Sequence, residues 1–148
     1  MMGMTRTSYS ISLRFPSTFE MVDFVQVISD HLGQMLHLDE DARHWIGVAV
    51  RESVINAIKH GNHSDASKLV FVDFVSTPSA EPTELEVKVR DQGEGFDPDA
   101  LPDPLAPENL LKSSGRGIFF MRSFMDDLAI RRAPEGGMEI RMVKRVAK

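Results

Sequence analysis

The stretch 38-LDEDARHWIGVAVRESVINAIKHGN-62 decides the fold, because it predicts one long helix with two different faces. Its first acidic residues suit a helix N-terminus, and the closing glycine and asparagine are typical of a helix C-terminus. Glu52, Asn56 and His60 recur every four residues and therefore form one polar stripe. Their neighbours are mostly apolar, and a polar group in such surroundings needs a partner. The stripe is therefore a candidate functional site.

The elements on either side follow from the spacing of apolar residues, which alternates in strands and has a longer period in helices. Ser17 and Thr18 are candidate N-caps of the first helix. In chain order we expect a strand at 8–16, helices at 17–36 and 38–62, strands at 67–77 and 83–91, a helix at 115–128, and strands at 128–134 and 138–145. This order predicts the α+β class, with residues 1–148 forming a single domain. We expect a two-layer α/β sandwich in which helices cover one face of a mixed, mainly antiparallel sheet.

Residues 93–112 interrupt this regular pattern. They contain four of the eight prolines and show little periodicity. A stretch of this kind inside a compact domain is typical of a functional lid or of a disordered insert. We expect a lid at about residues 96–114.

Composition limits the classes of function. The chain has 148 residues, no cysteine and a net charge of −5, with acids and bases interspersed. The charge argues against a nucleic-acid partner, which normally meets a basic face. Neither a signal peptide nor a membrane span is recognisable, so we expect a soluble cytoplasmic protein. An anionic ligand would have to be held by local groups such as backbone N–H and a metal ion.

Two interpretations of the polar stripe compete. In the first, Glu52 is a surface residue that pairs with Arg51 or Lys59, as long charged side chains commonly do. In the second, the side-chain oxygen of Asn56 is a magnesium ligand, and Glu52, one turn earlier, is a general base. A metal site at His60 and His63 is disfavoured, because the chain has no HExxH motif and no cysteine.

Two glycine-containing stretches also have two interpretations each. In 90-RDQGEGFDP-98, an aspartate follows a predicted strand and precedes two glycines, which fits either a hairpin turn or a binding site. The motif GRG at 115–117 fits either a flexible segment end or a helix start that approaches phosphate oxygens. The chain has no P-loop motif and no complete dinucleotide fingerprint.

Taken in order, ExxxN on a helix, DxGxG after a strand and GxG before a helix resemble the GHKL ATPase superfamily, which includes gyrase and the histidine kinases. Four stretches look more specifically like the bacterial anti-sigma factor serine/threonine kinases. They are VRESVINAIKHGN (50–62), RDQGEGFDP (90–98), LPDPLAPENLLKSSGRGIFFMRSFMDD (101–127) and RMVKR (141–145).

This resemblance implies a role for each motif. It implies that Glu52 is the catalytic base, that Asn56 holds Mg²⁺, and that Asp91 accepts a hydrogen bond from the adenine amino group of ATP. Relatives usually carry a threonine where this chain has Met138, which puts a second adenine contact in doubt. The candidate nucleotide-binding residues are Asn56, Lys59, His60, Asp91, Gly93, Gly95, Phe96, Gly115, Arg116, Gly117 and Ile118.

The function implied by the resemblance is that of an anti-sigma factor that is also an ATP-dependent serine/threonine kinase. Its partners would be a sigma factor, a STAS-domain anti-anti-sigma protein as phosphorylation substrate, and a second copy in a homodimer. Two alternatives remain open, namely a module that binds ATP without phosphotransfer and the ATPase domain of a histidine kinase. Retention of Glu52 favours the kinase, because nucleotide binding alone does not require a base.

Overall fold

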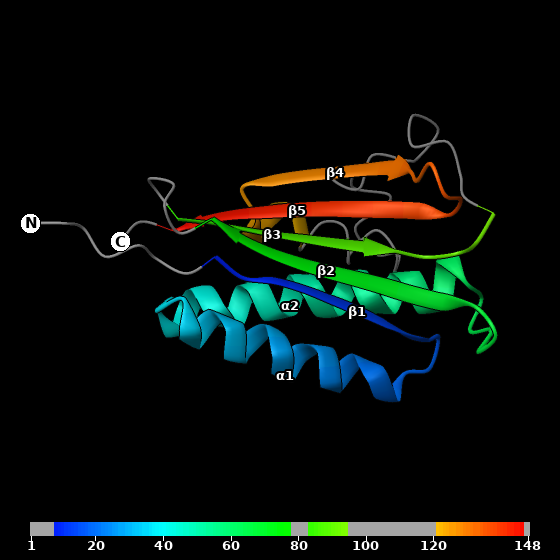
Figure 1. Ribbon diagram of the computed structural model, residues 1–148, viewed down its shortest axis with the longest axis horizontal. Helices are drawn as coiled ribbons and strands as arrows, with labels where there is room; N and C mark the ends of the chain where they lie inside the picture. Colours follow the sequence, from blue (N-terminus) through cyan, green and yellow to red (C-terminus); the bar gives the residue numbers. More distant parts are fainter. Residues whose placement is uncertain (1–7, 78–82, 95–120, 147–148) are drawn as a thin grey trace, which may run out of the picture.

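The computed structural model describes residues 8–77, 83–94 and 121–146, which form two layers (Figure 1). The elements are β1 (Ser10–Pro16), α1 (Glu20–Met35), α2 (Glu40–Asn56), the π-helical turn η1 (Ala57–Gly61), β2 (Leu69–Thr77), β3 (Thr83–Arg90), β4 (Asp127–Arg132) and β5 (Met138–Val146). Residues 121–124 form a helical turn before β4. No helix in these ranges is long and apolar enough to cross a membrane.

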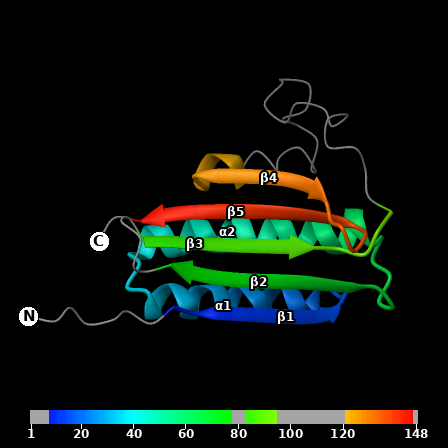
Figure 2. The ribbon, with the colours of Figure 1, turned by 45° about the horizontal axis from the view of Figure 1, so that its top comes forward.

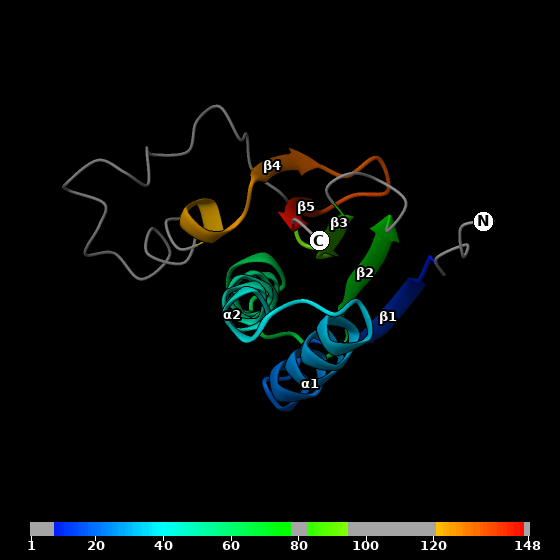
Figure 3. The ribbon, with the colours of Figure 1, turned by 90° about the vertical axis from the view of Figure 1, so that its left-hand side faces the viewer.

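The five strands form one sheet in the order β1-β2-β3-β5-β4, and all four pairings are antiparallel (Figure 2). Both long helices lie on the same face of this sheet, and α2 packs against β3 and β5 (Figure 3). The predicted α+β sandwich with helices on one face is therefore confirmed.

The core lies between the sheet and the helices. Alternation along the strands directs Val72, Phe74 and Val87 inward, where all three are fully buried. The other face carries charged residues that pair across neighbouring strands, such as Arg141 with Glu86 at 2.7 Å. One face of each strand is thus apolar and the other polar, which is why alternation predicted the strands well.

The helix ends differ from the prediction in two places. The N-cap of α1 is Phe19, so the expected capping by Ser17 or Thr18 is wrong. The side chain of Ser17 is buried elsewhere. The second helix does continue to Gly61 as predicted, but its last turn is π-helical, with Asn62 N–H donating to the Ala57 carbonyl at 2.8 Å.

The helical turn before β4 is attached to α2 by an aromatic stack. Trp45 on α2 stacks on Phe124, with ring centroids 4.0 Å apart and an interplanar angle of 19°. This region was predicted as helix up to residue 128, whereas β4 already begins at Asp127. The last two residues of the predicted helix, Asp127 and Leu128, therefore belong to β4 and pair with β5.

Candidate functional site

Several chain segments meet at one end of the sandwich, on the right in Figure 1. They include the ends of β1 and β3, the starts of β2 and β5, and the turn η1 that closes α2. The candidate residue Asp91 directly follows β3 at this end. The long helix with Glu52 and Asn56 leads toward the same place.

The carboxylate of Asp91 is buried, with 5% of the residue exposed. Its Oδ1 accepts hydrogen bonds from the backbone N–H of Gly93 at 2.9 Å and of Met138 at 3.1 Å. The backbone N–H of Asp91 in turn donates to the Met138 carbonyl at 3.0 Å. Among the described residues, Oδ2 has no donor, so the site presents one oriented acceptor.

Met138, whose side chain is buried, therefore contributes through its backbone. Met138 has no side-chain hydroxyl, and the contacts that it makes to Asp91 come from its main-chain N–H and carbonyl. The sequence could not indicate this contact, because every non-proline residue carries the same donor.

Three glycines enclose Asp91, and each leaves room that a Cβ would fill. A Cβ on Gly61 would overlap the Asp91 carboxylate, and one on Gly93 would overlap the Gly61 carbonyl. A Cβ on Gly137, which also has a φ of +82°, would overlap the Asp91 carbonyl. Of these, only Gly93 was predicted as a site residue. Gly137 lies between the last two predicted strands and Gly61 was interpreted as a helix stop, and neither was predicted to lie in the site.

Glu52 and Asn56 are half-buried on α2 and have no hydrogen-bond or ion-pair partner within the described residues. Arg51, the expected partner of Glu52, instead bonds Asp23 at 2.8 Å and Gln26 at 3.1 Å. The first interpretation of the stripe, a pair of Glu52 with Arg51 or Lys59, is therefore not observed within the described residues. Two half-buried polar side chains one helical turn apart remain available for a ligand.

Lys59 and His60 lie in η1 and are exposed. Partial burial lowers the pKa of His60 below 6.5, and the positive charges of Lys59 and His63 lower it further. The neutral imidazole is therefore favoured near pH 7. No group of three His, Cys, Asp or Glu side chains in the described ranges is arranged to hold a metal ion.

Asn62 is a further polar residue at this end, and it is fully buried. Its Nδ2 donates to Ser17 Oγ at 2.8 Å and to the Leu69 carbonyl at 3.0 Å, and its Oδ1 accepts from the Gln92 N–H at 2.8 Å. From the sequence it was interpreted as a helix stop. Its position just after a predicted helix gave no sign that the side chain turns inward.

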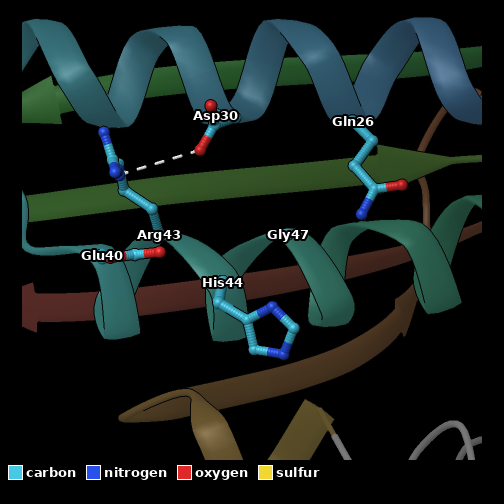
Figure 4. A pocket seen from close by; sticks show the side chains of 6 residues that line it. All are labelled: Gln26, Asp30, Glu40, Arg43, His44 and Gly47. Carbon is cyan, nitrogen blue, oxygen red and sulfur yellow. Dashed lines mark ion pairs between the residues drawn. The ribbon is translucent and has the colours of Figure 1, made fainter.

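A hollow of about 340 Å³ lies elsewhere, between α1 and α2, and none of the candidate site residues lines it (Figure 4). Gln26 and Asp30 reach into it from α1, and Arg43 Nε lies 3.8 Å from Asp30 Oδ1. Its lining residues are Gln26, Asp30, Glu40, Arg43, His44 and Gly47. Because its lining shares no residue with the surroundings of Asp91, this hollow is distinct from the Asp91 site.

The remaining candidate residues lie outside the described part of the chain. They are Gly95, Phe96, Gly115, Arg116, Gly117 and Ile118, and the expected lid at about 96–114 falls there too.

Sequence comparisons find relatives that align with most of this chain. The chain is 32% identical over 142 residues to the anti-sigma F factor of Oceanobacillus iheyensis, with 93% of each chain covered. It is 28% identical over 159 residues to the serine-protein kinase RsbW of Staphylococcus epidermidis, covering 98% of this chain and 92% of the relative. It is 35% identical over 107 residues to the anti-sigma F factor of Bacillus subtilis, covering 70% and 69%.

The match to a family extends over residues 15–144, from the end of β1 into β5. It therefore includes the polar stripe of α2, Asp91 with the residues around it, and the strands β2, β3 and β4. The chain belongs to the family of the histidine kinase-like ATPase domain.

Proposed function

We propose that this protein is an ATP-dependent serine/threonine kinase that also acts as an anti-sigma factor. The observation that carries the proposal is the pair Glu52 and Asn56, which lie half-buried and unpaired within the described residues on the helix that ends against Asp91. A site that binds ATP needs a hydrogen-bond acceptor for adenine and an oxygen ligand for Mg²⁺. Phosphoryl transfer also needs a general base. Asp91 after β3 and Asn56 and Glu52 on α2 match these three needs in turn.

Asp91 recognises the adenine. Its oriented Oδ2 accepts from the exocyclic amine, which guanine replaces with a carbonyl oxygen. An acceptor facing that oxygen is left unpaired and disfavours GTP. The enclosing glycines allow the neighbouring chain segments to pack closely around the Asp91 carboxylate and hold it in place.

The spacing along the helix suits the rest of the nucleotide. At about 1.5 Å per residue, Asn56 lies about 7 Å and Glu52 about 13 Å along the axis from Gly61, which contacts Asp91. An extended nucleoside triphosphate bound at Asp91 therefore runs its phosphates along the polar stripe. Lys59 and His60, on the adjoining turn, present donors to the same ligand.

Asn56 fits Mg²⁺, because its amide oxygen is a hard donor with no other partner among the described residues. Magnesium binds few protein ligands and shares phosphate oxygens with the substrate, so a single side chain is sufficient. The ion neutralises phosphate charge when it is bound.

Glu52 is the general base. It takes the proton of the partner's serine or threonine hydroxyl while the hydroxyl oxygen bonds to the γ-phosphorus and the bond to the ADP oxygen breaks. The half-buried position of Glu52 limits competition from water.

The partners follow from the names of the relatives, an anti-sigma F factor and a serine-protein kinase. We infer that this chain binds a sigma factor and phosphorylates a STAS-domain anti-anti-sigma protein. We infer as well that it works in the cytoplasm as a homodimer, which sedimentation at micromolar concentration would test.

The test uses Glu52→Gln and Asn56→Ala, with Glu40→Gln as a matched control on the same helix outside the site. Calorimetry measures Mg-ATP affinity, and phosphate incorporation into the cognate STAS protein measures transfer. Glu52→Gln should keep ATP affinity nearly unchanged while transfer falls by about a hundredfold or more. Asn56→Ala should weaken Mg-ATP binding itself, because the ion loses its protein ligand.

Glu40→Gln should change neither quantity. A wild-type protein that binds Mg-ATP but never phosphorylates its verified partner would contradict the kinase and leave an ATP-gated binding module. Unchanged transfer in Glu52→Gln would return Glu52 to a surface role.

A further inference from the structure

The buried Asn62 joins its own turn to three other segments of the chain. Its side chain bonds Ser17 before α1, Leu69 at the start of β2, and Gln92 after β3. Ser17 Oγ passes the connection on to the Lys68 carbonyl at 2.7 Å. Both amide donors and the amide oxygen of Asn62 are therefore used, so the network is satisfied in the way a buried polar group requires.

The backbone around Asn62 is unusual in a way that indicates a fixed position. The preceding turn is π-helical, and π-turns are frequent at functional sites. The two following residues, His63 and Ser64, have φ of 51° and 57°, a left-handed conformation that costs energy in non-glycine residues. Such a conformation persists only where surrounding bonds over-determine it. Here Ser64 N–H donates to the Ile58 carbonyl at 2.7 Å.

The network reaches the peptide that follows Asp91. The Gln92 N–H that bonds Asn62 belongs to the Asp91–Gln92 peptide, and Gln92 Oε1 accepts from Leu69 N–H at 2.7 Å. On the other side, Met138 holds the Asp91 carboxylate and backbone. Asp91 is thus held from two directions, by β5 and by Asn62.

We propose that Asn62 is a positioning residue for base selection, which sets how closely the Asp91 carboxylate meets the base without touching the nucleotide itself. The inference rests on the proposed function of Asp91 as the adenine acceptor. Losing the Asn62 amide frees the Asp91–Gln92 peptide. The carboxylate then adapts to either base, so ATP loses its favoured acceptor and GTP loses its penalty.

The test compares ATP and GTP affinity, measured by calorimetry, in the wild type, Asn62→Ala, Ser17→Ala and Asp91→Asn. We expect Asn62→Ala to lower the ATP-to-GTP affinity ratio by about tenfold, the equivalent of one well-placed hydrogen bond. Ser17→Ala removes only the far end of the network and should lower the ratio in the same direction by a smaller factor. It also keeps the test valid if Asn62→Ala folds poorly.

The control is Leu32→Ala, a buried substitution between α1 and the core, far from Asp91 along the chain. It should lower the melting temperature while leaving the base ratio unchanged, because lost packing alone does not reorient Asp91. If Asn62→Ala acted only by lowering stability, it would leave the ATP-to-GTP affinity ratio unchanged, as Leu32→Ala does. The affinity ratio therefore distinguishes a loss of positioning from simple destabilisation.

The outcomes also separate this inference from the function on which it rests. A wild-type preference for ATP that Asp91→Asn abolishes, with the ratio unchanged in Asn62→Ala and Ser17→Ala, overturns the role of Asn62 alone. A wild-type protein that binds both nucleotides equally, or neither, overturns the adenine role of Asp91 and the inference with it.

Discussion

The contact between Gly61 and Asp91 gives the sharpest single test of the Asp91 site. Gly61 closes η1, and its φ is not positive, so alanine is tolerated there by the backbone. A Cβ at this position would nevertheless overlap the Asp91 carboxylate. Gly61→Ala therefore tests whether the Asp91 carboxylate can move away from this position without a loss of stability.

The size of the effect follows from what holds Asp91. Hydrogen bonds to a charged group are worth about 1.5–3 kcal/mol each, and rotating the carboxylate away sacrifices at least one of its two backbone N–H bonds. Replacing a helical glycine with alanine returns about 0.5–1 kcal/mol. We expect a net loss of about 1–2 kcal/mol in unfolding free energy, which corresponds to about 3–8 °C in melting temperature.

A matched control lies on α2, where a Cβ on Gly47 would meet only the Gln26 side chain, with Nε2 at an ordinary 3.8 Å. Gly47→Ala should stabilise the protein by about 0.5–1 kcal/mol, because it gains the helix propensity without the overlap. Chemical denaturation measures both variants, and calorimetry measures their ATP affinity, which should fall for Gly61→Ala alone. The reasoning is refuted if Gly61→Ala is as stable as Gly47→Ala and binds ATP as the wild type does.

Two further predictions concern histidines. In the folded protein the pKa of His60 is lowered from 6.5, so protonation of this residue favours the unfolded state. The contribution of His60 to the free energy of unfolding is therefore complete above pH 6.5 and is lost as the pH falls below 6.5. His60→Gln should therefore flatten the pH dependence of the melting temperature below about pH 6.5, and an unchanged profile would contradict this. His37, at φ 60°, ends α1 in a Schellman motif, with its N–H on the Gln34 carbonyl and the Leu38 N–H on the Gly33 carbonyl. His37→Gly should stabilise the protein by up to about 1 kcal/mol in denaturant titrations, whereas His31→Gly inside α1 should destabilise it by a similar amount.

Much of the fold could be predicted because the spacing of apolar residues depends only on which face of each strand or helix is buried. Each strand has one face toward the helices and one toward solvent, so alternation in residues such as Val72 and Phe74 reports the sheet directly. The polar stripe of Glu52 and Asn56 was recognisable for the same reason, since helical spacing places them together whatever surrounds the helix.

The surroundings of Asp91 were less predictable, because they depend on contacts between distant segments. Gly61 and Gly137 look like an ordinary helix stop and hairpin turn until Asp91 is placed against them. Ser17 is a residue type that commonly caps helices, but its hydroxyl oxygen instead accepts a hydrogen bond from Asn62 Nδ2. A local pattern describes what a residue favours on its own, and tertiary hydrogen bonds decide which of those options is used.

The stack of Trp45 on Phe124 gives the protein a built-in optical reporter. The chain contains a single tryptophan, so its ultraviolet emission comes from one known place, at the junction between α2 and the helical turn that precedes β4. Because Trp45 is 40% exposed, separating the two rings would change both the contact of the indole with water and its rotational freedom. Emission wavelength and anisotropy therefore follow the spacing of these two elements in the unmodified protein, without any attached dye.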